Sequence, residues 1–216
     1  MHTAQVSACA VSTAAEQVAR YKDCGYTGII VTDHFINGNS TCPRHLPWQD
    51  KMAFFAAGYE AAKEAGAECG LDVFFGWEYS LRGTDLLTYG LGMDFLLANP
   101  GMDKLSIQEY SALVRANGGY LAQAHPFRYA AYIQNPFPVQ PEYLDGLEVY
   151  NASMPDEVNS QAFVFAKNNG LPMQAGSDAH NASLPYFAGV WLDKKANGVQ
   201  DIITAVKSGR VKLALP

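Results

Sequence analysis

The stretch Gly28-Ile29-Ile30-Val31-Thr32-Asp33-His34 is an apolar run that ends in a carboxylate and an imidazole. The same arrangement recurs at residues 71–78, 119–125 and 171–180. Strands that are buried on both faces read as continuous apolar runs, and the loops after strands carry the chemistry of α/β proteins. Because His, Asp and Glu are common ligands of zinc, iron and manganese, the sequence predicts an α/β metalloenzyme.

Length and composition are those of one globular domain. The chain has 216 residues, 49% of them apolar, so we expect a single domain over residues 1–216. Its formal net charge of −6, without runs of like charge, indicates no nucleic-acid-binding patch and no contact with an anionic membrane. The N-terminus lacks the apolar core of a signal peptide, and the four scattered cysteines predict reduced thiols. We therefore expect a cytoplasmic protein.

Apolar runs alternate with helical stretches along the whole chain. Two capping-box patterns, at Thr13 with Glu16 and at Ser106 with Glu109, each open a helix. Such alternation predicts parallel βαβ units, and six or seven can be counted. A small or distorted β/α barrel fits this number best, with a doubly wound open sheet as the alternative. The expected helices cover residues 14–24, 47–65, 106–117, 155–169 and 199–208, and a final strand covers residues 211–214.

Two segments rich in proline, asparagine and aromatic residues, 37–47 and 127–141, are expected to be loops. Each follows a candidate ligand, so we expect them to form the walls of a site.

Three candidate ligands follow apolar runs in the first part of the chain. His34 is a metal ligand or a core histidine, and Asp33 beside it could orient a ligand imidazole. Glu78 lies beside several aromatic residues, where a buried carboxylate needs a cation or a salt bridge. His125 is followed closely by Arg128, whose planar guanidinium suits phosphate or carboxylate.

The segment Gly176-Ser177-Asp178-Ala179-His180 is the strongest local signal. Two ligand side chains at i and i+2 of an extended segment project to the same face, where both can reach one cluster. Glu148 is a further carboxylate inside an apolar run, with a supporting or substrate-binding role.

With these residues assembled, the chain resembles the PHP (polymerase and histidinol phosphatase) family of metal-dependent phosphoesterases. The shared features run in order from an N-terminal His-Thr, through Thr-Asp-His, a strand-end Glu and Ala-His-Pro, to Gly-Ser-Asp-Ala-His. The resemblance implies a distorted (β/α)7 TIM-like barrel with two or three metal ions at the carboxyl ends of its strands. The implied ligands are His2, His34, Glu78 as the bridging carboxylate, Asp85, His125, Asp178 and His180.

The chain departs from the family pattern near its first residues. His2 matches the second histidine of the family's opening His-x-His, and only Met1 precedes it in the sequence. A further family ligand about six residues beyond is replaced by Ala8, with Ser7 and Cys9 on either side. Asp85 stands where family members often carry another histidine.

The resemblance implies hydrolysis of a small phosphate ester or nucleotide. Glu78 would hold the metal ions, Arg128 would bind a phosphate oxygen, and His180 or His34 could protonate the leaving group. The metal could be zinc, iron or manganese. A C–N bond amidohydrolase and a metal-binding or regulatory module with degenerate catalysis remain as alternatives. Aromatic residues that could line a nucleobase pocket are Tyr129, Tyr132, Phe137 and Tyr150.

Overall fold

The computed structural model describes residues 1–131, 133 and 136–216. Its helices are α1 (Ala14–Asp23), α2 (Trp48–Cys69), α3 (Met93–Ala98), α4 (Ile107–Ala116), α5 (Asp156–Asn169) and α6 (Val199–Lys207). Its strands are β1 (Gly28–Val31), β2 (Asp72–Leu81), β3 (Thr84–Tyr89), β4 (Tyr120–Gln123), β5 (Gly146–Asn151), β6 (Met173–Gly176), β7 (Gly189–Leu192) and β8 (Val211–Ala214). No helix in this described part of the chain is long and apolar enough to cross a membrane.

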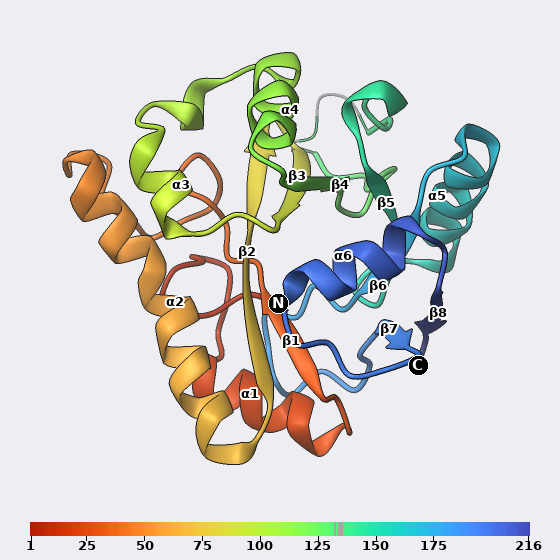
Figure 1. Cartoon of the computed structure of the whole chain (residues 1–216), viewed down its shortest axis with the longest axis horizontal. Coiled ribbons are helices and arrows are strands. Elements are labelled where there is room, and N and C mark those ends of the chain that lie inside the picture. The colour runs from red at the N-terminus through yellow and green to blue at the C-terminus, as the bar shows by residue number, and fades with distance from the viewer. Residues whose placement is uncertain (132, 134–135) are drawn as a thin grey trace.

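Strands β1 to β6 form one curled sheet in sequence order, and β7 pairs with β8 in a separate two-stranded antiparallel sheet beside β6 (Figure 1). The pairs β1–β2, β4–β5 and β5–β6 are parallel, whereas β3 is antiparallel to both of its neighbours. The predicted α/β class is therefore confirmed. Among the described residues the sheet is a curled half-barrel, and the closed seven-unit barrel is not seen.

A tight hairpin between β2 and β3 interrupts the expected alternation of strand and helix. Arg82 and Gly83 connect the two strands with φ angles of 50° and 95°. Two consecutive residues with positive φ are typical of a two-residue hairpin turn, whose twist matches that of the flanking strands. The hairpin makes β2 longer than predicted, and Glu78 consequently lies inside β2 rather than just past its end.

The helix predictions are confirmed with small differences at their ends. Both capping boxes are present, with Thr13 bonded to Glu16 and Ser106 bonded to Glu109. Helix α2 runs one turn further than predicted, to Cys69, because the chain reverses at Gly70 in the left-handed conformation with φ 70°. The short helix α3 and the strand β7 were not predicted from the sequence.

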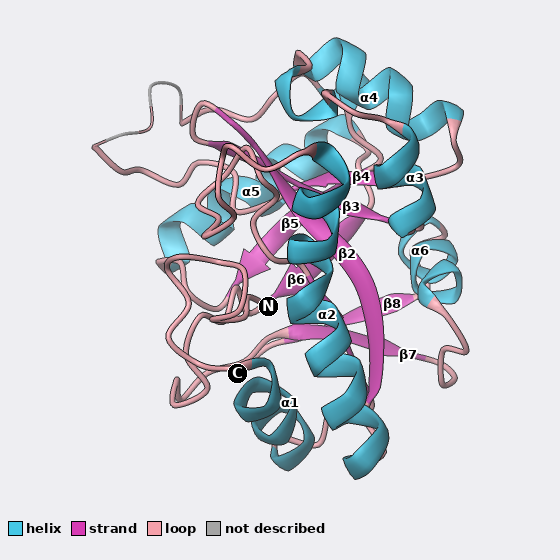
Figure 2. Cartoon of the chain, turned by 90° about the vertical axis from the view of Figure 1, so that its left-hand side faces the viewer, coloured by secondary structure: helices cyan, strands magenta, loops and turns pink. Residues whose placement is uncertain are grey.

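The two faces of the sheet pack against different helices. Trp77, Tyr79 and Leu86 point to the face covered by α2 and α4, and Figure 2 shows α2 lying along that side of β2. Leu87 and Tyr89 point to the opposite face, where they pack against α6. Neighbouring residues of a strand point to opposite faces of the sheet. The burial of these apolar side chains therefore fixes the face to which the polar side chains between them point.

Candidate metal centre

Seven side chains that the sequence marked as ligands converge on the concave side of the sheet. Two groups have donor atoms that all lie within 4.8 Å of one another, and both are largely buried. The first group contains His2, His34 and His180, and the second contains Glu78, Asp85 and His125. Asp178, the remaining residue, contacts the first group.

Glu78 joins the two groups. Trp77 and Tyr79 on either side of it face the outer helices, so alternation along β2 turns the Glu78 carboxylate to the concave side. Its Oε2 atom lies 2.7 Å from Nδ1 of His34 and 3.5 Å from Nε2 of His2, and its Oε1 atom lies 3.3 Å from Nε2 of His125. A single carboxylate therefore faces three imidazoles.

The contact between Glu78 and His34 lacks hydrogen-bond geometry. Neither Oε2 of Glu78 nor Nδ1 of His34 has a hydrogen-bond partner among the described residues, although both atoms are buried. Leaving a buried polar atom unpaired costs about 1–3 kcal/mol. A divalent cation accepts electron pairs from both kinds of atom, so the residues present fit a metal ion.

Ser7 fixes the tautomer of His2. The Ser7 hydroxyl donates to Oδ1 of Asp33 at 2.7 Å and accepts from the backbone N–H of His34 at 3.0 Å. Because its only proton goes to Asp33, Ser7 must accept from Nδ1 of His2, 3.1 Å away. Nε2 of His2 is then left without a proton, and it faces Oδ1 of Asp178 at 3.1 Å. A neutral imidazole binds a metal through its unprotonated nitrogen, so Nε2 of His2 is available as a ligand.

Asp33 supports the site through other residues rather than by contacting an imidazole. It accepts hydrogen bonds from the backbone N–H and the hydroxyl of Thr3 and from Ser7. The expectation that Asp33 could orient an imidazole thus holds only indirectly, through Ser7 and His2.

Asp178 and His180 reach the same cluster, but the backbone conformation of their segment differs from the prediction. Asp178 has a φ of 48°, so the segment is not extended as predicted. His180 turns back and donates from Nδ1 to the carbonyl of Asp178 at 2.8 Å, which leaves its Nε2 free to accept. Its ring stacks on that of His2 with centroids 4.1 Å apart.

His125 is held by a second carboxylate, Glu148. The backbone N–H of His125 donates to Oε2 of Glu148 at 2.8 Å, and Asn151 donates to the same oxygen at 2.9 Å. His125 has a φ of 28°, in a region that residues other than glycine seldom occupy. Such strain gathers at functional sites, where the surrounding structure must hold it.

The crowded carboxylates shift the ionisation of the imidazoles. Burial lowers the pKa of His34, but its contacts with Cys9 and Glu78 outweigh that effect and raise the pKa to about 11. Burial likewise lowers the pKa of His125, and the contact with Glu78 raises it to about 9. Burial also disfavours ionised Glu78, yet His125 and His34 hold its pKa well below the usual range. Without a cation, protons therefore occupy positions that a metal would take.

Cys9 also lies at the cluster, and the sequence gave it no role. Its Sγ atom lies 3.2 Å from Nε2 of His34, and it also interacts with the imidazole of His180. Burial raises the pKa of the thiol, but these two contacts lower it to about 6. Its position next to Ala8, where a ligand was expected, was the only signal in the sequence.

Arg128 lies near the second donor group. It lines a small hollow together with Asp85 and His125, and its backbone N–H donates to the carbonyl of His125 at 3.2 Å. Asp85 accepts a hydrogen bond from Ser80 at 2.6 Å across the hairpin and lies 3.8 Å from Nε2 of His125.

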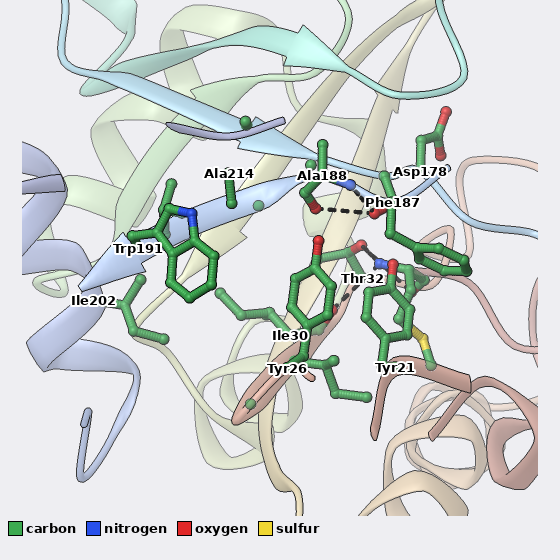
Figure 3. A pocket seen from close by; sticks show the side chains of 18 of the residues that line it. Tyr21, Tyr26, Ile30, Thr32, Asp178, Phe187, Ala188, Trp191, Ile202 and Ala214 are labelled. Carbon is green, nitrogen blue, oxygen red and sulfur yellow. Dashed lines mark hydrogen bonds between the residues drawn. The ribbon is translucent and has the colours of Figure 1, made fainter. Parts of the chain in front are cut away.

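A cavity of about 800 Å³ extends from the cluster along the concave side of the sheet. His2, Glu78, His125 and Asp178 are among its lining residues. Figure 3 shows Asp178 at one end of this cavity and Trp191 at the other, with Tyr26 between them.

Of the aromatic residues proposed for a nucleobase pocket, the three that the structure describes, Tyr129, Phe137 and Tyr150, do not line this cavity. The exposed fractions of Tyr129 and Phe137 are 85% and 63%. Tyr150 is half-buried in β5, and Tyr132 lies outside the described residues.

Comparisons with known proteins agree with this architecture. Residues 156–211 match a family model described as PHP-associated. A two-domain protein from Bacteroides vulgatus, containing a predicted PHP-like metal-dependent phosphoesterase, superposes with a TM-score of 0.68 at 14% identity. The match covers 100% of this chain and 63% of that protein. The family-model match is confined to residues 156–211, and the solved structure, at 14% identity, shows a likeness of fold.

Two further solved structures share the fold of this chain. One, from Bifidobacterium adolescentis, is provisionally named a metal-dependent phosphoesterase; it has a TM-score of 0.57 at 17% identity, over 98% of this chain and 95% of that one. The other is an amidohydrolase from Chromobacterium violaceum, with bound sulfate and no metal, which has a TM-score of 0.58 at 13% identity over 98% and 95% of the two chains. No curated protein matches the sequence.

Proposed function

We propose that this PHP-like chain is a metal-dependent phosphoesterase that hydrolyses a small phosphate ester. The observation that carries the proposal is the position of Glu78, whose two carboxylate oxygens face imidazoles of both donor groups. One carboxylate can in this way bridge two cations. The solved structures named as metal-dependent phosphoesterases support the same reaction class.

Two or three divalent cations would be held by the residues that the sequence marked. Imidazole and carboxylate donors suit zinc, iron and manganese. When bound, such ions polarise phosphoryl oxygens and make a bound water acidic near neutral pH. The proposed ligands are His2, His34, Glu78, Asp85, His125, Asp178 and His180.

The chain's own side chains would position the substrate and move its proton. Arg128 would hold a non-bridging phosphate oxygen next to His125. His180 keeps its Nδ1 on the carbonyl of Asp178, and 27% of its side chain is exposed, so it would act as the general acid only in a form whose Nε2 carries a proton and is not bound to a cation.

The cavity limits the substrate to a small molecule. Its volume of about 800 Å³ falls within the range of ligand sites, and Tyr21, Tyr26 and Tyr89 offer apolar surface with polar tips. We propose that the organic part of the ester lies in this cavity and that its phosphate faces the cluster.

Two other functions are compatible with the same cluster. The amidohydrolase from Chromobacterium violaceum shares the fold, so hydrolysis of a C–N bond is the second candidate. A metal-binding or regulatory module without turnover is the third.

The test combines metal analysis with parallel assays of phosphoesters and cyclic amides. The phosphoesterase proposal expects turnover of a phosphomonoester or phosphodiester that stops on chelation and returns with Zn²⁺ or Mn²⁺. Glu78→Gln should lose both metal and turnover, whereas Glu60→Gln, at an exposed position of α2, should change neither. Turnover of amides alone would favour the second candidate, and full metal content without any turnover would favour the third.

A further inference from the structure

We propose that Cys9 is a metal ligand, whose thiolate binds the same cation as the ring nitrogens of His34 and His180. The inference rests on the metal centre proposed above and adds to it a residue type that the sequence did not predict there. It also favours zinc among the candidate metals.

The fold carries Cys9 to the cluster by backbone contacts on both sides of it. The N–H of Ala8 donates to the carbonyl of Asn39 at 2.8 Å, and the N–H of Val11 donates to the carbonyl of His180 at 2.9 Å. The loop is therefore tied to the segment after His34 and to His180 itself, and the position of the thiol does not depend on Cys9 alone.

The geometry at Cys9 is close to that of a bound ion. Sulfur and nitrogen donors on one tetrahedral zinc, at about 2.3 and 2.05 Å from it, lie about 3.6 Å apart. Sγ of Cys9 lies 3.2 Å from Nε2 of His34. Separating the two atoms by a few tenths of an ångström would admit the ion, and a change of side-chain rotamer at the exposed Cys9 can supply it.

A second observation concerns which ring nitrogens face Cys9. Nδ1 of His34 lies 2.7 Å from Oε2 of Glu78, whose side chain is 2% exposed, and the opposite nitrogen of the ring, Nε2, faces Cys9. His180 commits its Nδ1 to a backbone carbonyl, which leaves Nε2 as an acceptor. Sγ of Cys9 and the Nε2 atoms of His34 and His180 are thus the electron-pair donors on this side of the cluster.

A thiolate ligand changes which metal ion the site prefers. Soft sulfur ligands favour zinc over manganese and magnesium, which prefer carboxylate and water. We therefore expect the ion at Cys9 to be zinc in the native protein.

Cobalt is the probe for this ligand, because a thiolate bound to Co²⁺ gives a near-ultraviolet charge-transfer band that imidazole and carboxylate ligands do not give. The protein stripped of metal and titrated with Co²⁺ should develop this band. Cys9→Ser and Cys9→Asp should lack it, and Cys9→Ser should bind zinc at least about tenfold more weakly. Cys24→Ser, at an exposed cysteine in the C-cap of α1, should keep both the band and the affinity.

An independent measurement uses the unaltered protein. Iodoacetamide should modify Cys9 after treatment with a chelator and leave it unmodified in zinc-loaded protein, while Cys24 reacts in both. Cobalt binding without a sulfur band, or equal alkylation of Cys9 with and without zinc, would overturn the inference.

These results separate the inference from the proposed function. A sulfur band in a protein that hydrolyses no phosphoester supports Cys9 as a ligand and rejects the phosphoesterase. Phosphoester turnover in a protein whose cobalt form lacks the band supports the phosphoesterase and rejects Cys9 as a ligand.

Discussion

The hydroxyl of Ser7 lies 3.1 Å from Nδ1 of His2 and sets which nitrogen of that ring is free. Ser7 can do so because it gives its own proton to Asp33. A buried hydroxyl thereby prepares an imidazole for metal binding from outside the cluster, as partners of metal-bound histidines commonly do.

Removing this hydroxyl should weaken both the fold and the metal site. Ser7→Ala leaves the N–H of His34 and Nδ1 of His2 without their acceptor, so we expect a loss of about 1–3 kcal/mol in the free energy of unfolding. Metal affinity should fall about 10- to 100-fold. Urea unfolding and competition with a chelator measure the two effects. Ser183→Ala, at an exposed serine, serves as the control, and unchanged metal affinity in Ser7→Ala would contradict the role of Ser7.

A glycine in α2 makes room for the same network. A Cβ at Gly58 would overlap the carboxylate of Asp33 and the hydroxyl of Thr3. Gly→Ala inside a helix normally stabilises by about 1 kcal/mol, but here the overlap should reverse the sign and destabilise by about 1–3 kcal/mol. A Cβ at Gly92 would meet no described atom within 4 Å, so Gly92→Ala is the matched control for thermal unfolding. A Gly58→Ala protein as stable as the wild type would disprove the overlap.

Metal uptake should release protons. Because the pKa values of His34 and His125 are raised to about 11 and about 9, both rings carry protons at pH 7 in the absence of a cation. Ligands must be deprotonated to bind, so apparent metal affinity should rise with pH between about 6 and 9. Calorimetry in two buffers with different ionisation enthalpies gives the number of protons released. A value of zero at pH 7 would be inconsistent with these two rings as ligands.

Glu148 should make the metal-free protein less stable as the pH rises. Burial raises the pKa of this carboxyl to about 7 from 4.5, so the folded protein binds more protons than the unfolded chain between these values. The stability that this group contributes is complete below pH 4.5 and is lost as the pH rises through 7, by up to about 3 kcal/mol. Glu148→Gln should remove this part of the pH dependence. Urea unfolding in the presence of chelator from pH 4.5 to 8 tests it, and a constant difference between the two proteins would refute it.

Arg128 should affect substrate use and leave the metal content unchanged. Arg128→Lys keeps the charge but loses the planar pair of donors, so we expect kcat/KM for a phosphoester to fall about tenfold or more. Arg210→Lys, at an exposed arginine before β8, is the control. Metal content measured on the same samples distinguishes loss of phosphate binding from loss of the cluster, and an unchanged kcat/KM would remove Arg128 from the proposed site.

Local sequence patterns determined much of the fold. The capping boxes at Thr13 and Ser106 predicted two helix starts correctly, since a cap depends on residues three positions apart. The β2–β3 hairpin was missed because its signal is only Arg82-Gly83 within a long apolar segment. The sheet therefore differs from a simple series of parallel units.

The sequence by itself determined which side chains could bind a metal, because imidazoles and carboxylates placed at apolar strand ends are costly to bury without a partner. Only the tertiary structure decided how they combine. Glu78 faces both donor groups because β2 alternates between the face packed against α2 and α4 and the concave face. Cys9 joins His34 and His180 because its loop folds back onto both segments. Such contacts between distant residues depend on the path of the chain, which no local pattern records.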